Sequence, residues 1–189
     1  MKYKSAIRRS VVIISILLLS VLIGFLYQFV CDKIDRANYP QKFTEYVQKY
    51  SVEYGVPEYV VYSTIKVESG FDSSAESSAG AIGLMQLMPD TFKYLMTEMH
   101  EEYKSDLICG PETNIKCGTY YLSKLYLKYK NWDTAFAAYN GGETNVDGWL
   151  KDKAYSEDGV KLDKIPFPET EKYVAKMNRA IEVYTRLYY

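Results

Sequence analysis

Residues 66–92, KVESGFDSSAESSAGAIGLMQLMPDTF, set a single glutamate, Glu68, ahead of a run of serine, alanine and glycine that closes on Gly-Leu-Met-Gln. On a helix, Val61, Ile65 and Glu68 follow one another at steps of four and three residues, so Glu68 extends an apolar stripe. Partial desolvation and the negative end of the helix dipole then both raise its pKa, as a general acid requires. A helix-end glutamate that bends outward to water is the alternative.

The segment after Glu68 has short side chains, which leave room beside the carboxylate for a large extended ligand. Its small residues are Ser73, Ser74, Ala75, Ser77, Ser78, Ala79, Gly80 and Gly83. A mobile linker has a similar composition, but the apolar GLMQLMP that follows should pack and pin the loop. Gln86 adds a donor and an acceptor there, and a buried glutamine satisfied by backbone groups is the alternative reading of that residue.

From residue 40 onward the pattern is helical almost to the end of the chain. The predicted helices cover 41–54, 58–69, 89–102, a long segment from Pro111, a short segment capped by Asp133 and ending at Ala138, and a last segment from Pro168. Only 160–165 reads as a short candidate strand. With 189 residues, of which 48% are hydrophobic, the chain can form one compact domain. We therefore expect a single all-α domain over residues 40–189.

The N-terminal residues predict a membrane anchor followed by a polar tether, residues 31–39. The span 11–30 has only three polar interruptions and is long enough to cross a bilayer as a helix. The tail before it, residues 1–10, contains four basic residues, which favour a cytoplasmic location for this end and an extracytoplasmic, wall-side location for the domain. The basic residues are Lys2, Lys4, Arg8 and Arg9.

A cleaved signal peptide is the alternative to a retained anchor. The segment GFLYQFVCDK offers no small-residue cleavage pattern, which favours the anchor. Cys31 lies where a lipidated cysteine would lie, but Phe29 and Val30 before it are larger than a lipoprotein signal normally has. We therefore expect a single-pass membrane protein.

Charge and cysteine content exclude several other classes. Lys and Arg total 23 against 24 for Asp and Glu, and no basic stripe is present, so nucleic acid is not an expected partner. The cysteines and the lone His100 show no ligand spacing, so no metal site is expected. Cys109 and Cys117 are near enough for a local disulfide in an oxidising compartment, and two small buried residues are the alternative.

Four segments together resemble the soluble lytic transglycosylase (SLT) family, bacterial enzymes that cut the glycan strands of peptidoglycan on a goose-type lysozyme-like helical fold. They are GVPEYVVYSTIKVESGFDSSAESSAGAIGLMQLMPDT, GPETNIKCGTYYLSKL, AFAAYNGGETNV and FPETEKYVAKMNRAIEVY. Their order and approximate spacing match the family over nearly all of residues 52–184. The resemblance implies a lysozyme-like catalytic domain that needs no metal or organic cofactor.

The resemblance also implies roles for individual residues. Glu68 matches the catalytic acid and base, and Tyr139 matches the tyrosine that lies beside it. The residues implied in substrate binding are Ser77, Met85, Gln86, Asn140 and Tyr173. The chain departs from the family pattern where Ser73 replaces a proline, Gly110 an aspartate and Gly141 an alanine.

The implied reaction cleaves the β-1,4 bond between N-acetylmuramic acid and N-acetylglucosamine. Glu68 first protonates the glycosidic oxygen and then deprotonates the muramyl 6-hydroxyl, which closes into a 1,6-anhydro end. The expected partners are glycan strands and, through residues 11–30, the membrane. The nearest other carboxylates are Asp72, in a turn, and Glu76, in the small-residue loop without apolar neighbours, and neither looks prepared to activate water.

Two alternatives remain at this point. One is a goose-type lysozyme that hydrolyses the same bond. The other is a catalytically silent wall-binding scaffold of an envelope-spanning machine. The process served stays open among wall turnover, division, secretion, conjugation and spore formation.

Overall fold

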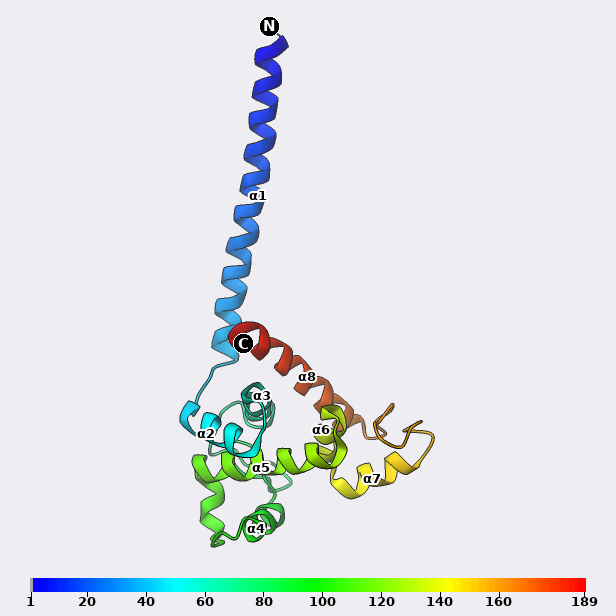
Figure 1. The fold of residues 1–189 in the computed structure, drawn as a ribbon. Helices are drawn as coiled ribbons and strands as arrows, with labels where there is room; N and C mark the ends of the chain where they lie inside the picture. Colours follow the sequence, from blue (N-terminus) through cyan, green and yellow to red (C-terminus); the bar gives the residue numbers. More distant parts are fainter. Residues whose placement is uncertain (1) are drawn as a thin grey trace. The chain divides into compact units, whose positions relative to one another are not determined.

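The computed structural model describes the backbone of residues 2–189 and the side chains from Ile13 onward, and it divides the chain after Pro40 into two units. The first unit is one helix, α1 (Lys2–Asn38) (Figure 1). Its part Ile13–Asn38 is long and apolar enough to cross a membrane, by length and composition. The predicted tether is therefore helical as far as Asn38. The basic side chains of the predicted tail, residues 1–10, lie outside the described side chains.

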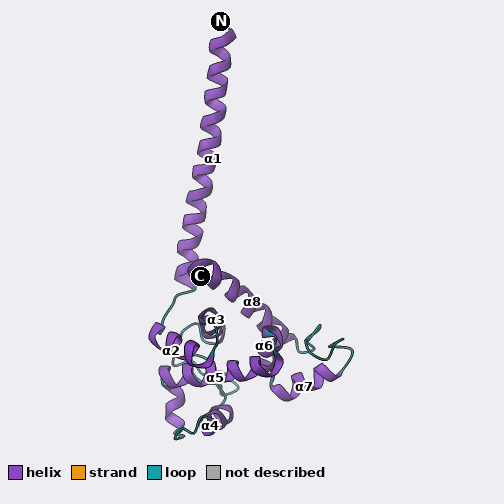
Figure 2. Ribbon diagram, viewed as in Figure 1, coloured by secondary structure: helices purple, strands orange, loops and turns teal. Residues whose placement is uncertain are grey.

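The second unit is all helical, as predicted (Figure 2). Its elements are α2 (Thr44–Tyr54), α3 (Glu58–Glu68), α4 (Pro89–Glu98), the short 3₁₀ helix η1 (Ser105–Cys109), α5 (Pro111–Tyr129), α6 (Trp132–Gly141), α7 (Glu143–Lys151) and α8 (Pro168–Tyr188). The part of the chain that the structure describes contains no β-strand, only isolated bridges from Ile82 to Glu76 and to Leu87.

Helix α5 is the centre of this unit, because α2, α4 and α6 all pack against it (Figure 1). Helix α8 packs along α3 and α6. Between α3 and α8, Tyr62 stacks on Tyr184 with ring centroids 5.6 Å apart, and both rings are fully buried. Prolines begin α4, α5 and α8 because the fixed φ of proline suits the first helical turn. The core thus fixes the ends of α3, α6 and α8 relative to one another.

The predicted strand at 160–165 is wrong, because this segment belongs to a loop that satisfies its own backbone. The Asp158 carboxylate accepts hydrogen bonds from the N–H groups of Val160 and Lys161 at 2.8 and 3.0 Å. The Ser156 hydroxyl donates to the Lys161 carbonyl at 2.7 Å. Side chains that bond to nearby backbone groups compete with a strand ladder in this way.

Helix α7 was not predicted. Its sequence, ETNVDGWLK, contains glycine, threonine and asparagine, which are weak helix formers. Tertiary contacts compensate: Lys128 of α5 forms ion pairs with Glu143 at 2.9 Å and Asp147 at 2.8 Å. Val146 and Trp149 are buried on its inner side. Contacts with α5, which a local pattern does not contain, therefore stabilise α7.

Several predicted helix limits also differ from the structure: α3 ends at Glu68, one residue early, and α6 ends at Gly141 and not at Ala138. Helix α2 begins at Thr44 because Phe43 has a left-handed φ of 58°, and α4 ends at Glu98, just before His100 at a φ of 56°. Helix α6 is capped by Asn131, whose side-chain oxygen accepts from the Thr134 N–H at 2.9 Å. Asp133, the predicted cap, instead accepts from Asn178 on α8.

Cys109 and Cys117 form no disulfide. Both thiols are free, and they differ in environment because Cys109 is exposed and Cys117 is buried. Burial raises the pKa of the Cys117 thiol to about 12. The alternative of two small buried residues therefore holds for Cys117 alone.

Candidate active site

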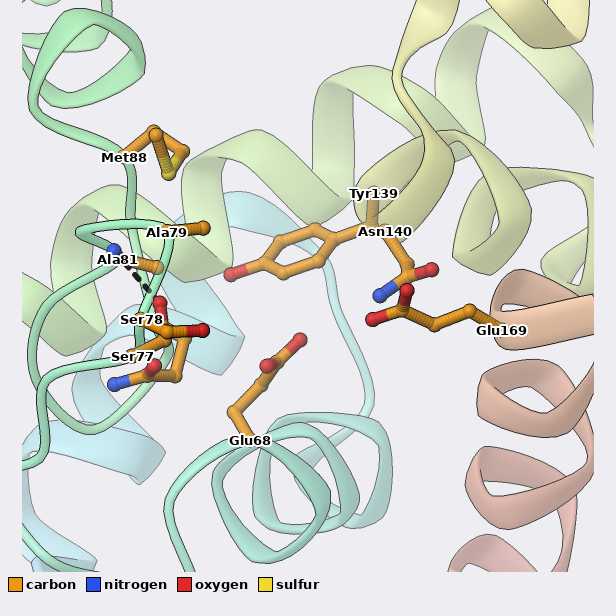
Figure 3. Close-up of a pocket in the computed structure, with 10 residues that line it drawn as sticks. Glu68, Ser77, Ser78, Ala79, Ala81, Met88, Tyr139, Asn140 and Glu169 are labelled. Carbon is orange, nitrogen blue, oxygen red and sulfur yellow. Dashed lines mark hydrogen bonds between the residues drawn. The ribbon is translucent and has the colours of Figure 1, made fainter. Parts of the chain in front are cut away.

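A cleft of about 310 Å³ lies where the end of α3, the small-residue loop, α6 and the start of α8 meet (Figure 3). Figure 3 shows the side chains of Glu68 and Tyr139 directed into the same space. The lining residues are Glu68, Ser77, Ser78, Ala79, Ala81, Gln86, Met88, Tyr139, Asn140 and Glu169. The small-residue loop therefore forms a low wall beside Glu68, as predicted from its composition.

Glu68 is the last residue of α3 and is half-buried. Burial raises the pKa of its carboxyl to about 7, and the nearby Tyr173 hydroxyl opposes this rise only in part. Desolvation dominates because it destabilises the charged form. Near neutral pH, Glu68 can therefore both give and take a proton, and the upward direction is the one predicted from the apolar stripe.

Tyr173 of α8 is only 7% exposed and does not line the cleft. Its hydroxyl has no hydrogen-bond partner within the described residues. Burial, and next the charge of Glu68, hold the pKa of Tyr173 well above its usual value. A role of Tyr173 in substrate binding therefore stays a prediction.

Tyr139 of α6 has a half-buried ring that lines the cleft (Figure 3). Its hydroxyl donates a hydrogen bond to the Met85 carbonyl at 2.7 Å. Burial, and next the charge of Glu68, hold the pKa of Tyr139 well above its usual value. Tyr139 thus lies beside Glu68, as the resemblance implied, but its hydroxyl is bonded to the loop.

Met85 is fully buried, so its side chain cannot contact a ligand in the cleft. That side chain packs on Gly118 of α5, and a role of Met85 in substrate binding stays a prediction. Met85 reaches the site through its backbone carbonyl.

Gln86 and Ser77 both line the cleft and both brace the loop. The Gln86 amide nitrogen donates to the carbonyls of Ala75 at 3.1 Å and Gly83 at 3.0 Å, so its amide oxygen is the group left for a ligand. The Ser77 hydroxyl oxygen accepts from the Ala81 N–H at 2.9 Å, which leaves its hydrogen for a ligand. The alternative reading of Gln86, a glutamine satisfied by backbone groups, therefore holds for its amide nitrogen.

Asn140 lines the cleft and accepts a hydrogen bond from the buried Thr170 hydroxyl at 2.9 Å. A Cβ at the next residue, Gly141, would come within 3.0 Å of the same hydroxyl and 3.4 Å of Trp149, so the alanine usual in the family would require a small shift. Gly110 begins α5 without a side-chain cap, the contact that an aspartate there would supply.

The sequence did not identify Glu169, a second carboxylate that lines the cleft. It lies in the first turn of α8, where an acidic residue is expected for the helix dipole alone, so its position carried no functional signal. Asp72 and Glu76 do not line the cleft. Asp72 accepts from the Ser74 N–H at 2.9 Å in a turn, and Glu76 is exposed, as predicted for both.

A smaller cleft of about 170 Å³ adjoins the first. The two share Gln86, Met88, Tyr139 and Asn140, and the smaller one adds Leu87, Thr91, Tyr121 and Gly142. Because they share these residues, the two clefts form one continuous groove.

A family model described as the transglycosylase SLT domain matches residues 45–160. The chain belongs to this family. The SLT chain is 31% identical over 155 residues to the soluble lytic murein transglycosylase of Escherichia coli (strain K12), covering 80% of the chain and 24% of that relative. It is 27% identical over 187 residues to the membrane-bound lytic murein transglycosylase C of Photorhabdus laumondii, covering 83% of the chain and 50% of that relative.

Among solved structures, the SLT chain superposes on an inactive Glu-to-Gln mutant of lytic transglycosylase Slt from Pseudomonas aeruginosa with a TM-score of 0.70 and 28% identity. The match covers 80% of this chain and 25% of that one. The lysozyme-like helical fold is therefore shown. The SLT chain spans between a quarter and a half of the length of these relatives.

Proposed function

We propose that this chain is a peptidoglycan lytic transglycosylase with Glu68 as its general acid and base. The observation that carries the proposal is a half-buried carboxyl with a pKa of about 7 at the edge of a groove. A carboxyl with that pKa is poised for both proton transfers near neutral pH. The relatives named lytic transglycosylases support the substrate, and the Pseudomonas protein is described as inactive when one glutamate becomes glutamine.

In the proposed reaction, protonated Glu68 donates its proton to the glycosidic oxygen between N-acetylmuramic acid and N-acetylglucosamine. The substrate's acetamido group stabilises the cationic centre, as in substrate-assisted glycosidases. The Glu68 carboxylate then takes the proton of the muramyl 6-hydroxyl, which closes on the anomeric carbon. Ser77, Gln86 and Asn140 are the polar groups proposed to hold the sugars, since each lines the groove.

Hydrolysis by a goose-type lysozyme is the nearest competing reaction. Besides the general acid, it needs a second group that acts as a base and activates water. Asp72 is unsuitable, since its carboxylate is engaged in a turn outside the cleft. Glu169 does line the cleft, but it is exposed in the first turn of α8, where the helix dipole alone accounts for an acidic residue. Transglycosylation is therefore favoured over hydrolysis.

Product analysis tests this choice. The full chain, solubilised in detergent, is incubated with purified peptidoglycan, and the released fragments are analysed by mass with and without borohydride reduction. We expect anhydromuramyl ends, lighter by one water than hydrolytic ends and not reducible, and Asp72→Asn should release them at nearly the normal rate. Reducible muramic acid ends would show a hydrolase. Glu169→Gln would then test whether Glu169 is the base that activates water. A wild-type protein that releases nothing would indicate a wall-binding scaffold.

We further propose that α1 retains the protein in the cell membrane with the catalytic domain on the wall side. The apolar part of α1 and the similarity to relatives named membrane-bound support this localisation. The full-length protein should sediment with membranes, and protease added outside wall-permeabilised cells should digest the domain. Recovery of a shortened protein in the soluble fraction, beginning near Cys31, would instead show a cleaved signal.

A further inference from the structure

Met85 is held from three directions by two helices. Its backbone N–H donates to the Asn114 side-chain oxygen at 2.8 Å, and its carbonyl accepts from the Tyr139 hydroxyl at 2.7 Å. Its side chain lies directly on Gly118, where an added Cβ would be 2.4 Å from the Met85 sulfur and 2.8 Å from its Cβ. Asn114 and Gly118 are four residues apart on α5 and so lie on the same face of that helix.

The Asn114 amide is fully buried and fully used. Its oxygen accepts from the Met85 N–H, and its nitrogen donates to the carbonyls of Ile82 at 3.0 Å and Ile108 at 2.8 Å. The loop approaches this amide so closely that a Cβ at Gly83 would be 2.4 Å from its nitrogen. Asn114 therefore ties both ends of the turn 82–85 to α5.

Met85 in turn connects α5 to the groups that line the cleft. Tyr139, its hydrogen-bond partner, presents its ring to the cleft beside Glu68 (Figure 3). Gln86, the next residue, has a left-handed φ of 48°, a conformation that non-glycine residues keep only when their surroundings impose it. A displacement of Met85 would therefore move Tyr139 and Gln86 together.

We propose that Asn114 and Gly118 are positioning residues for the reaction, which act on the cleft through Met85 without touching substrate. The inference rests on the proposed function, since it concerns the geometry of that same site. Misplacement of about 1 Å in such a site can cost about 10²-fold in rate even when the change is remote from the chemistry. The competing explanation is that both residues serve only the stability of α5.

Steady-state kinetics on soluble glycan strands with the detergent-solubilised full chain separate these explanations. Asn114→Ser removes all three hydrogen bonds, and Gly118→Ala pushes on Met85 while alanine favours the helix. Both should lower kcat by roughly tenfold or more with KM changed by less than about twofold. The control is Leu125→Ala, a buried residue of α5 outside both clefts, which should lower the melting temperature and leave kcat nearly unchanged.

Double variants with Tyr139→Phe provide the decisive measurement. If Asn114 and Gly118 act through Met85 on Tyr139, their effects on kcat should be smaller in the Tyr139→Phe protein than in the wild type, whereas the small effect of Leu125→Ala should be the same in both. Fully multiplicative effects, or kcat values no lower than that of Leu125→Ala, would overturn the inference. If Asn114→Ser does not fold, Gly118→Ala alone decides. An inactive wild type would contradict the proposed function instead.

Discussion

Glu68→Gln is expected to reduce the release of glycan fragments from peptidoglycan by at least about 10²-fold, the usual contribution of a positioned general acid or base. Glutamine keeps the size and polarity of the side chain but can neither donate the proton to the leaving oxygen nor take one back. Because the same group is proposed for both steps, this one substitution removes both proton transfers. Fragment release is measured by turbidity loss and by mass analysis of the products.

Glu76→Gln is the matched control for this substitution. Glu76 lies in the small-residue loop a few residues after Glu68, but it is exposed and does not line the cleft. The same chemical change there should leave activity near the wild-type level. Helical circular dichroism and binding to insoluble glycan should be unchanged in both variants. Near-normal lysis by Glu68→Gln would remove the central claim of the proposed function.

The partial burial and raised pKa of Glu68 were predictable because their signal is local. A carboxylate that extends the apolar stripe of Val61 and Ile65 is desolvated on any helix that packs, and the structure raises its pKa accordingly. The small residues of the loop were informative for the same reason, because short side chains leave the space beside Glu68 open. Local periodicity and composition therefore predicted both the carboxyl and the space beside it.

The partners of the site residues were not predictable from local patterns. The bond from Tyr139 to the Met85 carbonyl joins residues 54 positions apart, and the cleft gains Glu169 from the start of α8. These relations depend on how α5, α6 and α8 pack, which no short window of sequence contains. The same holds for α7, whose ion pairs with Lys128 outweigh its weak helix formers.

Glu68 should also make the folded protein less stable as pH rises. Burial raises its pKa from 4.5 to about 7, so between these values the unfolded chain ionises this carboxyl while the folded chain keeps it protonated. The unfolded state then binds fewer protons, and the free energy of unfolding falls with pH across that window. Below pH 4.5 the carboxyl is protonated in both states and does not change the free energy of unfolding. Above pH 7 the decrease in the free energy of unfolding is complete.

Glu68→Gln should therefore be as stable as the wild type at pH 4 and more stable at pH 8. One pKa unit corresponds to about 1.36 kcal/mol, and after a discount for partial solvent access we expect a gain of about 1–3 kcal/mol at pH 8. Thermal unfolding of both proteins from pH 4 to pH 8 measures the difference, with Glu76→Gln as an exposed control that should change stability little. Equal stability of the Glu68→Gln and wild-type proteins at pH 8 would mean that Glu68 is solvated and unsuited to act as an acid. A gain that grows between pH 4.5 and 7, together with loss of lysis, would show that the protein keeps a destabilising carboxyl because the reaction requires it.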